Sequence, residues 1–236
     1  MNPYGVVVTK KKYVPFAFIA VDIVVLTIRD RQLQVMTVRR GEEPDVGKLA
    51  LPGGFVKKDE DLEAAARREL VEETNLEVEF LEQIKTYGAP DRDPRGRTIS
   101  VLYVAVVPDL PEGVAGTVAT EALWVPVAEL EKMRLPFDHS IMLADAVERA
   151  RAKLEYSPLA ASFCREPFTI GQLRRVYEIV WGKEKYDIDP ANFQRKVLSA
   201  KDFVVATGEV VSDGPGRPAR QYRLGTASIL NPPVTR

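Results

Sequence analysis

Three glutamates constrain the fold of this chain more than any other feature of its sequence. Segment 53–76 reads GGFVKKDEDLEAAARRELVEETNL, and a helix is predicted near residues 60–74. Glu69, Glu72 and Glu73 are spaced i, i+3 and i+4, so their carboxylates leave this helix on the same side. Like charges so placed repel, and a hard cation with oxygen ligands removes the repulsion. The spacing indicates a Mg²⁺ site, and the alternative is a solvated acidic helix face.

The residues around the three glutamates favour the metal site. Gly53 and Gly54 precede the helix and allow the backbone to approach a ligand closely. Gly54 is followed after five residues by Glu60, and after seven more by Arg68 and the string ELVEETNL. This arrangement resembles the Nudix box, the signature of hydrolases acting on nucleoside diphosphates linked to another group. Because the motif is long and constrained, a solvated face becomes the weaker interpretation.

The Nudix resemblance implies a role for each box residue. Glu69, Glu72 and Glu73 would be metal ligands or the base that activates water, and Arg68 would orient a box carboxylate by an ion pair. One position departs from the pattern, because Asn75 stands where the box usually carries glycine. Asparagine tolerates the left-handed conformation that ends a helix, so we expect a mild structural effect.

The rest of the first part alternates strands with helices. A second helix is predicted at 140–155. Strands are predicted at 16–28, 33–40, 98–107 and 122–127. Mixed strands with two helices packed on them predict an α+β fold, here a Nudix-type α/β/α sandwich.

Further candidate residues follow the box. Segment 86–105 resembles the corresponding part of Nudix ADP-ribose pyrophosphatases, and Arg92, Arg95 and Arg97 within it are candidates to bind phosphates. The alternative for these arginines is a solvated loop. Glu121 is a candidate catalytic base outside the box, although a surface glutamate is the favoured interpretation.

Composition excludes several other classes. His139 is the only histidine and has no evident partner for a triad or a zinc site, so a structural role is favoured. Cys164 is the only cysteine and cannot form an internal disulfide, which favours the cytoplasm. The longest apolar run, 16–28, contains Asp22 and is too short to span a bilayer. Residues 1–12 lack the apolar core of a signal peptide.

The last third of the chain has a different character. Residues 156–236 carry twelve Lys and Arg against eight Asp and Glu, whereas the whole chain has a net charge of −1. Residues 157–168 are interpreted as a linker. A helix is predicted at 168–182, where Thr169 and Gln172 have capping-box spacing.

A second helix is predicted at 189–200, with Asp189 as its cap and Pro190 at its first position. Phe193 and Val197 would face inward. The opposite stripe would be polar and suited to base edges and phosphates in a major groove. Its members are Asn192, Arg195, Lys196 and Ser199.

Two strands, 203–211 and 220–224, are predicted to flank the loop SDGPGRPA. Arg217 in this loop and Arg220 beyond it would project like the wing of a winged helix-turn-helix domain and reach DNA. The alternative is a small helical appendage with a surface hairpin. The sequence of capped helix, turn, polar-striped helix and arginine-tipped hairpin favours DNA.

The combination of both halves resembles the NrtR family, the Nudix-related transcriptional regulators of NAD metabolism. The resemblance implies a Nudix domain at 1–156 that senses ADP-ribose or a related nucleotide. It also implies a winged helix-turn-helix domain at 157–236 that represses genes of NAD synthesis or salvage. Helix-turn-helix geometry predicts a homodimer on a near-palindromic operator of double-stranded DNA, with no membrane partner. The alternative is a Mg²⁺-dependent ADP-ribose pyrophosphatase, or both activities in one chain.

Overall fold

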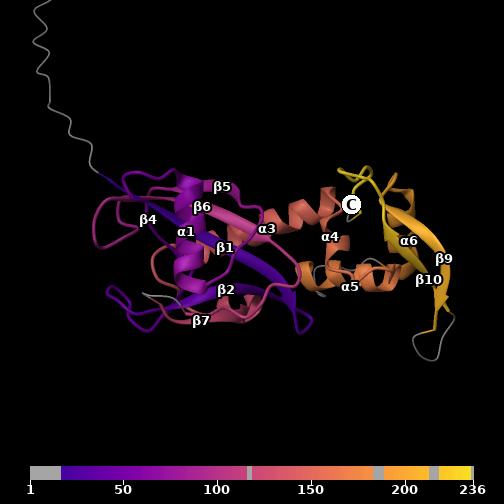
Figure 1. The fold of residues 1–236 in the computed structure, drawn as a ribbon, viewed down its shortest axis with the longest axis horizontal. Helices are drawn as coiled ribbons and strands as arrows, with labels where there is room; N and C mark the ends of the chain where they lie inside the picture. The colour runs from indigo at the N-terminus through magenta and orange to yellow at the C-terminus, as the bar shows by residue number, and fades with distance from the viewer. Residues whose placement is uncertain (1–16, 116–118, 183–188, 213–217, 235–236) are drawn as a thin grey trace, which may run out of the picture.

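The computed structural model describes residues 17–115, 119–182, 189–212 and 218–234 (Figure 1). The first part of the chain forms the strands β1 (Phe18–Arg29), β2 (Gln32–Arg40), β3 (Leu49–Ala50), β4 (Gly53–Phe55), β5 (Glu82–Tyr87), β6 (Thr98–Val106) and β7 (Ala119–Pro126). Its helices are α1 (Leu62–Thr74), α2 (Val127–Leu130) and α3 (His139–Tyr156). The second part contains α4 (Leu159–Ser162), β8 (Phe168–Thr169), α5 (Ile170–Trp181), α6 (Pro190–Ser199), β9 (Val204–Val211) and β10 (Ala219–Leu224).

Seven strands form one mixed sheet in the first part. Its order is β3-β2-β1-β6-β5, with β4 paired to β1 and β7 paired to β2. The β1–β2 pair is antiparallel, whereas β1 and β6 are parallel. The four predicted strands correspond to β1, β2, β6 and β7. The short strands β3 and β4 and the edge strand β5 were not predicted.

Helices cover both faces of this sheet. α1 buries Ala65, Ala66 and Leu70 against one face, in a cluster that includes Ile23 of β1. α3 packs on the other face, where Met142 belongs to a separate cluster of buried residues. The predicted α/β/α sandwich with a mixed sheet is confirmed. None of the helices in the described residues is both long and apolar enough to cross a membrane.

Both ends of α1 are stabilised by polar residues. The Asp61 carboxylate accepts a hydrogen bond from the Ala64 N–H at 2.8 Å and caps the first turn. Asn75 ends the helix in the left-handed conformation, with φ of 53°, and its N–H donates to the Val71 carbonyl. The conformation predicted for Asn75 is confirmed. The left-handed conformation of Asn75 turns the backbone away from the axis of α1 shortly after the last box glutamate.

The segment predicted as a linker is packed into the protein. Residues 157–168 include the short helix α4, in which Ala160 and Ala161 are buried. Both alanines join the cluster of buried residues that contains α3. The interpretation as a linker is therefore wrong. Small side chains here allow α4 to approach its neighbours, and loss of helical periodicity over a few residues does not imply an exposed chain.

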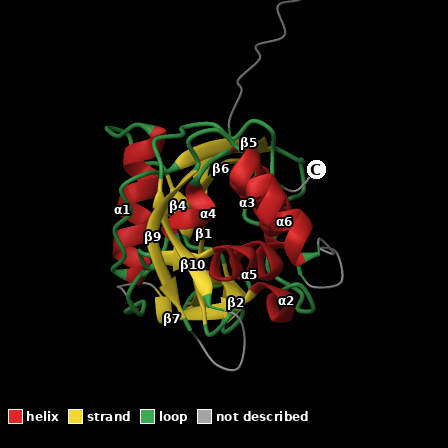
Figure 2. Cartoon of the chain, turned by 90° about the vertical axis from the view of Figure 1, so that its right-hand side faces the viewer, coloured by secondary structure: helices red, strands yellow, loops and turns green. Residues whose placement is uncertain are grey.

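The second part forms a small winged-helix unit (Figure 2). Thr169 and Gln172 form both bonds of a capping box at the start of α5, as predicted. The Asp189 carboxylate caps α6 by accepting from the N–H groups of its first turn. β10 lies between β8 and β9 in a three-stranded antiparallel sheet. The predicted helices and strands of this part are confirmed.

The long helix α3 joins the two parts. The Tyr177 hydroxyl of α5 donates to the Leu154 carbonyl at 3.1 Å, and the Arg151 guanidinium donates to the Val180 carbonyl at 3.1 Å. Tyr177 is fully buried. One cluster of buried residues runs from the sheet across α3 and into α5 and α6. Hydrophobic packing is therefore continuous across the predicted domain boundary.

The end of the described chain returns to α3 beyond the wing. The Leu230 N–H donates to the Tyr156 carbonyl at 2.8 Å. Leu230 and Val234 are buried in the same cluster as α3 and α5. This returning segment fastens the winged-helix unit to the last turn of α3 on a second side.

Asn75 provides a test of the helix end. Asn75→Gly should stabilise the protein by roughly 0.5 kcal/mol, because glycine adopts the left-handed conformation at no steric cost. Asn75→Ala should destabilise it by roughly 1 kcal/mol, because alanine has no polar group to offset that cost. Urea unfolding measures both changes. A stability order with alanine above glycine would contradict the assigned conformation.

Candidate functional site

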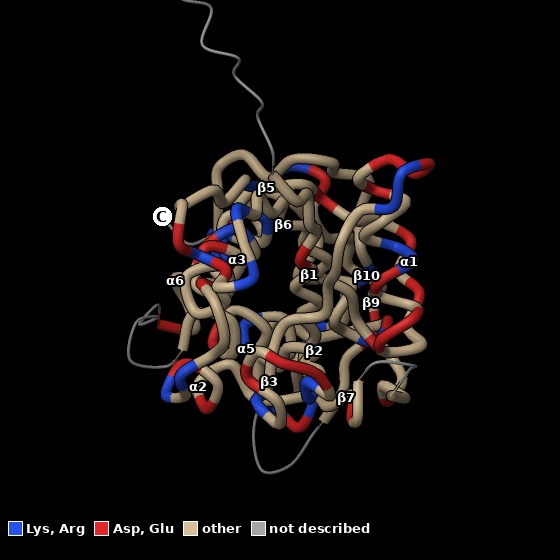
Figure 3. The backbone as a smooth tube through the Cα atoms, turned by 90° about the vertical axis from the view of Figure 1, so that its left-hand side faces the viewer, with Lys and Arg blue, Asp and Glu red and all other residues tan. Residues whose placement is uncertain are grey.

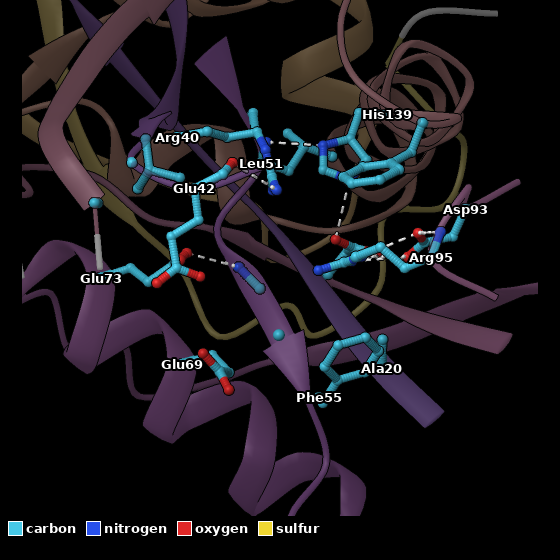
Figure 4. A pocket seen from close by; sticks show the side chains of 18 of the residues that line it. Ala20, Arg40, Glu42, Leu51, Phe55, Glu69, Glu73, Asp93, Arg95 and His139 are labelled. Atoms are coloured by element: carbon cyan, nitrogen blue, oxygen red, sulfur yellow. Dashed lines mark hydrogen bonds and ion pairs between the residues drawn. The ribbon is translucent and has the colours of Figure 1, made fainter. Parts of the chain in front are cut away.

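A cavity of about 220 Å³ opens between α1, the central strand β1 and the start of α3 (Figure 4). Glu69 and Glu73 rise from α1 on one side of it. Arg95 and His139 lie across from them. The cavity therefore places carboxylates opposite the Arg95 guanidinium and a histidine, an arrangement suited to a ligand that carries negative charge and is bound together with a cation.

Glu73 is the most perturbed carboxylate of the site. Burial, together with the neighbouring charges of Glu69 and Asp22, raises its pKa to about 7, although a hydrogen bond from the Gly53 N–H at 2.9 Å opposes the rise. Gly53 can reach Glu73 because it lies tightly against β1. A Cβ atom at Gly53 would stand 2.3 Å from the Val21 carbonyl oxygen. The glycine is thus required by close packing.

Glu69 lies beside Glu73 and close to Gly54. A Cβ atom at Gly54 would stand 2.5 Å from the Glu69 carboxylate, so only glycine leaves room for that group. Burial raises the pKa of Glu69, although its hydrogen bond with Arg68 opposes the effect. Because burial and mutual repulsion disfavour the ionised forms of these two carboxyl groups, a cation bound between them would be stabilising.

Arg68 organises the box by using all five of its N–H groups. Its guanidinium donates twice to Glu60, at 2.8 and 2.6 Å, and once to Glu69 at 2.6 Å. It also donates to Glu72 at 2.9 Å and to the Phe55 carbonyl at 3.1 Å. The bonds that Glu60 accepts from Arg68, and a further one from the Lys57 N–H, lower the pKa of Glu60 to about 2. Arg68 therefore joins β4 to α1 and fixes the rotamers of the box carboxylates.

Glu72 lies apart from the two pocket carboxylates. One of its oxygens accepts from Arg68, and the other pairs with the Lys57 ammonium at 3.3 Å. Burial raises its pKa, but these two cations outweigh that effect and lower it. Figure 3 shows the mixture of acidic and basic residues along α1. The structure brings Glu69 and Glu73 together in the cavity, whereas Glu72 is held outside its wall.

The carboxylate oxygens at this wall are of the kind that a hard divalent cation prefers, but they supply only part of its ligand set. Within the described residues, no three acidic, histidine or cysteine side chains are grouped closely enough to hold a metal ion as they stand. Glu73 uses one oxygen for Gly53 and Glu69 uses one for Arg68, so each keeps a second oxygen for ligation. Together with substrate phosphate oxygens, these two carboxylates fit the ligand preference of Mg²⁺. Glu72 would join them after release from Lys57.

A buried polar network lies beneath the cavity, centred on Asp22 of β1. The Ser100 hydroxyl donates to Asp22, and His139 Nε2 lies 3.2 Å from its other oxygen. The Leu51 N–H donates to His139 Nδ1 at 3.0 Å, which assigns the neutral tautomer with its proton on Nε2. Burial raises the pKa of Asp22, but His139, Ser100 and the nearby Arg92 outweigh it and hold the pKa below its usual value.

The three arginines predicted for phosphate binding occupy different positions. Arg92 is buried and forms a bidentate pair with Asp138, at 2.9 and 2.5 Å. Arg95 lines the cavity and pairs with Asp93. Arg97 lies outside the cavity wall, where its guanidinium donates to backbone carbonyls. Only Arg95 of the three combines a place in the cavity with solvent access.

Arg40 is a pocket residue that sequence analysis missed. Its guanidinium stacks on Phe137, 5.0 Å from the ring centre, and Arg95 stacks on the same ring at 5.3 Å. Arg95 also stacks on Phe55 at 4.9 Å. Burial lowers the pKa of Arg40, and the charge of Arg95 lowers it further. The Arg39–Arg40 pair at the end of a predicted strand was the available signal.

The candidate base Glu121 and the single cysteine, Cys164, both lie away from the cavity. Glu121 is exposed on β7, where its carboxylate pairs with Arg39 at 2.8 Å across the sheet. It does not line the cavity. Cys164 is half-buried beside the main cluster of buried residues, and burial raises its pKa to about 12. A thiol so protonated is a poor nucleophile.

The predicted DNA-binding residues are grouped on α6 and the wing. Arg195 and Ser199 are exposed, whereas Asn192 and Lys196 are half-buried. The Arg195 guanidinium donates to the side-chain amide oxygen (Oδ1) of Asn192 at 2.7 Å. Arg220 is exposed at the start of β10. Arg217 lies outside the described residues.

The chain matches two protein families. Residues 19–146 match the NUDIX domain family, and residues 160–224 match the NrtR DNA-binding winged helix domain. The cavity and the box lie within the first match, and α6 with the wing strands lies within the second. Nearly all of the described chain is therefore accounted for by these two families.

Whole-length relatives combine the same two domains. The ADPR responsive transcriptional repressor NtrR of Acinetobacter baylyi is 31% identical over 217 residues, which cover 91% of this chain and 85% of that protein. Shewanella oneidensis NrtR complexed with a 27mer DNA is 33% identical, with a TM-score of 0.66, over 87% of this chain and 93% of that one. The NUDIX domain of the same protein, complexed with ADP ribose, is 34% identical with a TM-score of 0.56, over 59% of this chain and 92% of that one.

Glu73→Gln should change how stability depends on pH. A carboxyl with its pKa raised to about 7 holds its proton in the folded state while the unfolded state has lost it. The contribution of Glu73 to the stability of the wild-type protein is therefore lost as pH rises from about 4.5 to about 7. In EDTA at pH 8, the variant should be more stable by on the order of 2 kcal/mol.

Urea unfolding at pH 5 and pH 8 measures this difference. Glu72→Gln is the matched control with the opposite sign, because the pKa of Glu72 is lowered and its charge contributes stability at pH 8. A Glu73→Gln variant less stable than wild type at pH 8 would show that the carboxylate is charged and well compensated without metal.

Proposed function

The chain belongs to the NrtR family, and from that premise we propose that it is a transcriptional repressor whose Nudix domain binds ADP-ribose. The single observation that carries this proposal is the attachment of a winged-helix unit to the cavity through α3. The protein would bind operator DNA as a homodimer in the cytoplasm and control genes of NAD synthesis or salvage. The division at residue 156 separates the sensing part from the DNA-binding part.

The charge of the cavity supports a diphosphate ligand. Arg40 and Arg95 carry like charges and stack on the same ring of Phe137. The two positive charges repel each other at this short separation, and an anion bound between them would offset that repulsion. Arginine pairs with phosphate through charge-assisted hydrogen bonds, and the opposing carboxylates would hold a cation against the same phosphates. A nucleoside diphosphate such as ADP-ribose carries the two phosphates that this arrangement fits.

α3 supports communication between the two parts. At its start, Asp138 binds Arg92 and His139 binds Asp22, so the helix forms part of the cavity wall. At its end, Leu154 accepts a hydrogen bond from α5. The helix has 18 residues and spans roughly 27 Å. A ligand that favours one position of this helix thereby favours one position of the winged-helix unit.

A second function, ADP-ribose hydrolysis, is favoured by the intact box. Nudix proteins generally use divalent metal ions. We propose Mg²⁺ here, held by Glu69 and Glu73 with Glu72, where it would supply charge neutralisation at the phosphates and activate water. Arg68 would position these carboxylates. Slow hydrolysis would then remove the ligand that releases the repressor, so the two functions are compatible in one chain.

ADP-ribose should weaken DNA binding by roughly tenfold or more, within the range of ordinary allosteric coupling. Fluorescence anisotropy of the duplex upstream of the protein's own coding sequence measures this, with EDTA present to stop hydrolysis. Arg40→Gln should bind the duplex normally but resist release, because the glutamine amide can still donate to Pro44 yet carries no charge for phosphate. Lys132→Gln removes an exposed cation outside the cavity and should behave as wild type. A gain in DNA affinity with ADP-ribose would contradict the proposal.

Glu73→Gln and Glu72→Gln should each abolish Mg²⁺-dependent hydrolysis of ADP-ribose while leaving DNA binding within about twofold of wild type. Hydrolysis and DNA binding should respond differently to these substitutions, because the box lies in the first part of the chain and α6 lies in the second. Formation of AMP and ribose 5-phosphate from ADP-ribose in the presence of Mg²⁺ measures hydrolysis, and anisotropy in EDTA measures DNA binding. Hydrolysis that survives both substitutions would exclude the proposed metal site.

A further inference from the structure

The burial of α6 defines which of its residues can meet DNA. Phe193 and Val197 are fully buried against the winged-helix core. Successive residues of an α-helix are about 100° apart, so the direction opposite these two side chains is that of Arg195. Leu198 lies roughly 60° to one side of Arg195, and Asn192 lies roughly 60° to the other. The outward face is therefore centred on Arg195 and includes an apolar residue.

Arg195 is held for recognition of a base. Its hydrogen bond to Asn192, at 2.7 Å, uses one N–H of the guanidinium and restrains the side chain along the helix. Arginine donates two parallel hydrogen bonds to the O6 and N7 atoms of guanine in the major groove. Ser199 is less suited to a base, because its hydroxyl donates to the Lys196 carbonyl within the helix. The structure thus favours Arg195 as the guanine-reading residue of α6.

Leu198 is half exposed, with 50% of its surface accessible, and its position distinguishes it from other exposed apolar residues. Leu198 lies three positions after Arg195, a rise of about 4.5 Å along the helix, and neighbouring base pairs are about 3.4 Å apart. A helix lying in the major groove therefore brings Leu198 to the base pair next to the one that Arg195 contacts. The apolar group that the major groove offers is the C5-methyl of thymine.

We propose that Leu198 reads the methyl group of a thymine in the base pair adjacent to the guanine bound by Arg195. This inference rests on the proposed DNA-binding function and deepens it, because it predicts a part of the operator sequence. Each half-site would contain a guanine with a thymine in the neighbouring base pair. Leu198 would thereby distinguish thymine from bases without a C5-methyl group, through van der Waals contact and burial of that methyl group and without a hydrogen bond.

The test begins with duplexes recovered by the full-length wild-type protein from a randomised DNA pool. The recovered half-sites should share a guanine next to a base pair that contains thymine. Replacing that thymine by deoxyuridine removes only the methyl group and should weaken wild-type binding about fourfold, the effect of one methyl-sized group removed from an apolar contact. Leu198→Ala should weaken binding to the thymine duplex by a similar factor and should be insensitive to the replacement.

Two control variants distinguish a specific effect of Leu198 from a general loss of DNA affinity. Ile229→Ala removes another exposed apolar side chain, outside α6, and should retain the full deoxyuridine effect. Arg195→Ala should relax selection at the guanine. Equal deoxyuridine effects in wild type and Leu198→Ala, or half-sites without thymine beside guanine, would overturn the inference while leaving DNA binding intact. Failure to enrich any sequence from the pool would overturn the repressor proposal, and this inference with it.

Discussion

The architecture depends on one buried carboxylate, that of Asp22, in the central strand of the sheet. A charge at that depth is tolerated only when polar partners surround it. Ser100, His139 and Arg92 supply those partners, and each comes from a different segment of the chain. Satisfying one carboxylate therefore fixes a neighbouring strand, the start of α3 and the loop after β5. These same segments form the floor and wall of the cavity, so the geometry of the site follows from that requirement.

Features of this structure that depend on neighbouring residues could be predicted from the sequence. The capping box of Thr169 and Gln172 and the left-handed Asn75 each depend on residues within one helical turn, and the structure contains both. Contacts between residues that are distant in the sequence could not be predicted in this way. Nothing near Arg40 indicates that it shares an aromatic ring with Arg95, because the two arginines are fifty-five positions apart in the sequence. The outward face of α6 was assigned by polarity alone, so Leu198 was overlooked although its helical angle is adjacent to that of Arg195.

An intact box is compatible with a regulatory role because its carboxylates are not equivalent. Glu73 is buried and faces the cavity, whereas both oxygens of Glu72 are held by Arg68 and Lys57. A metal that needs all three must compete with a lysine of the same chain. Exposed ion pairs are weak, so this competition lowers metal affinity without preventing binding. Whether the domain only binds its nucleotide or also hydrolyses it then depends on the metal affinity of this one site. The same residues are compatible with both activities.

The segment that returns from the wing has a consequence for how the protein unfolds. Leu230 and Val234 share one buried cluster with α3 and α5, and that cluster continues to the sheet beneath the cavity. Because the two units share this buried cluster, we expect them to unfold together rather than independently. A nucleotide bound in the cavity adds its binding free energy to the stability of that whole unit. The DNA-binding end is then protected against unfolding and proteolysis by a ligand it never touches, so nucleotide supply would set the lifetime of the protein as well as its occupancy of DNA.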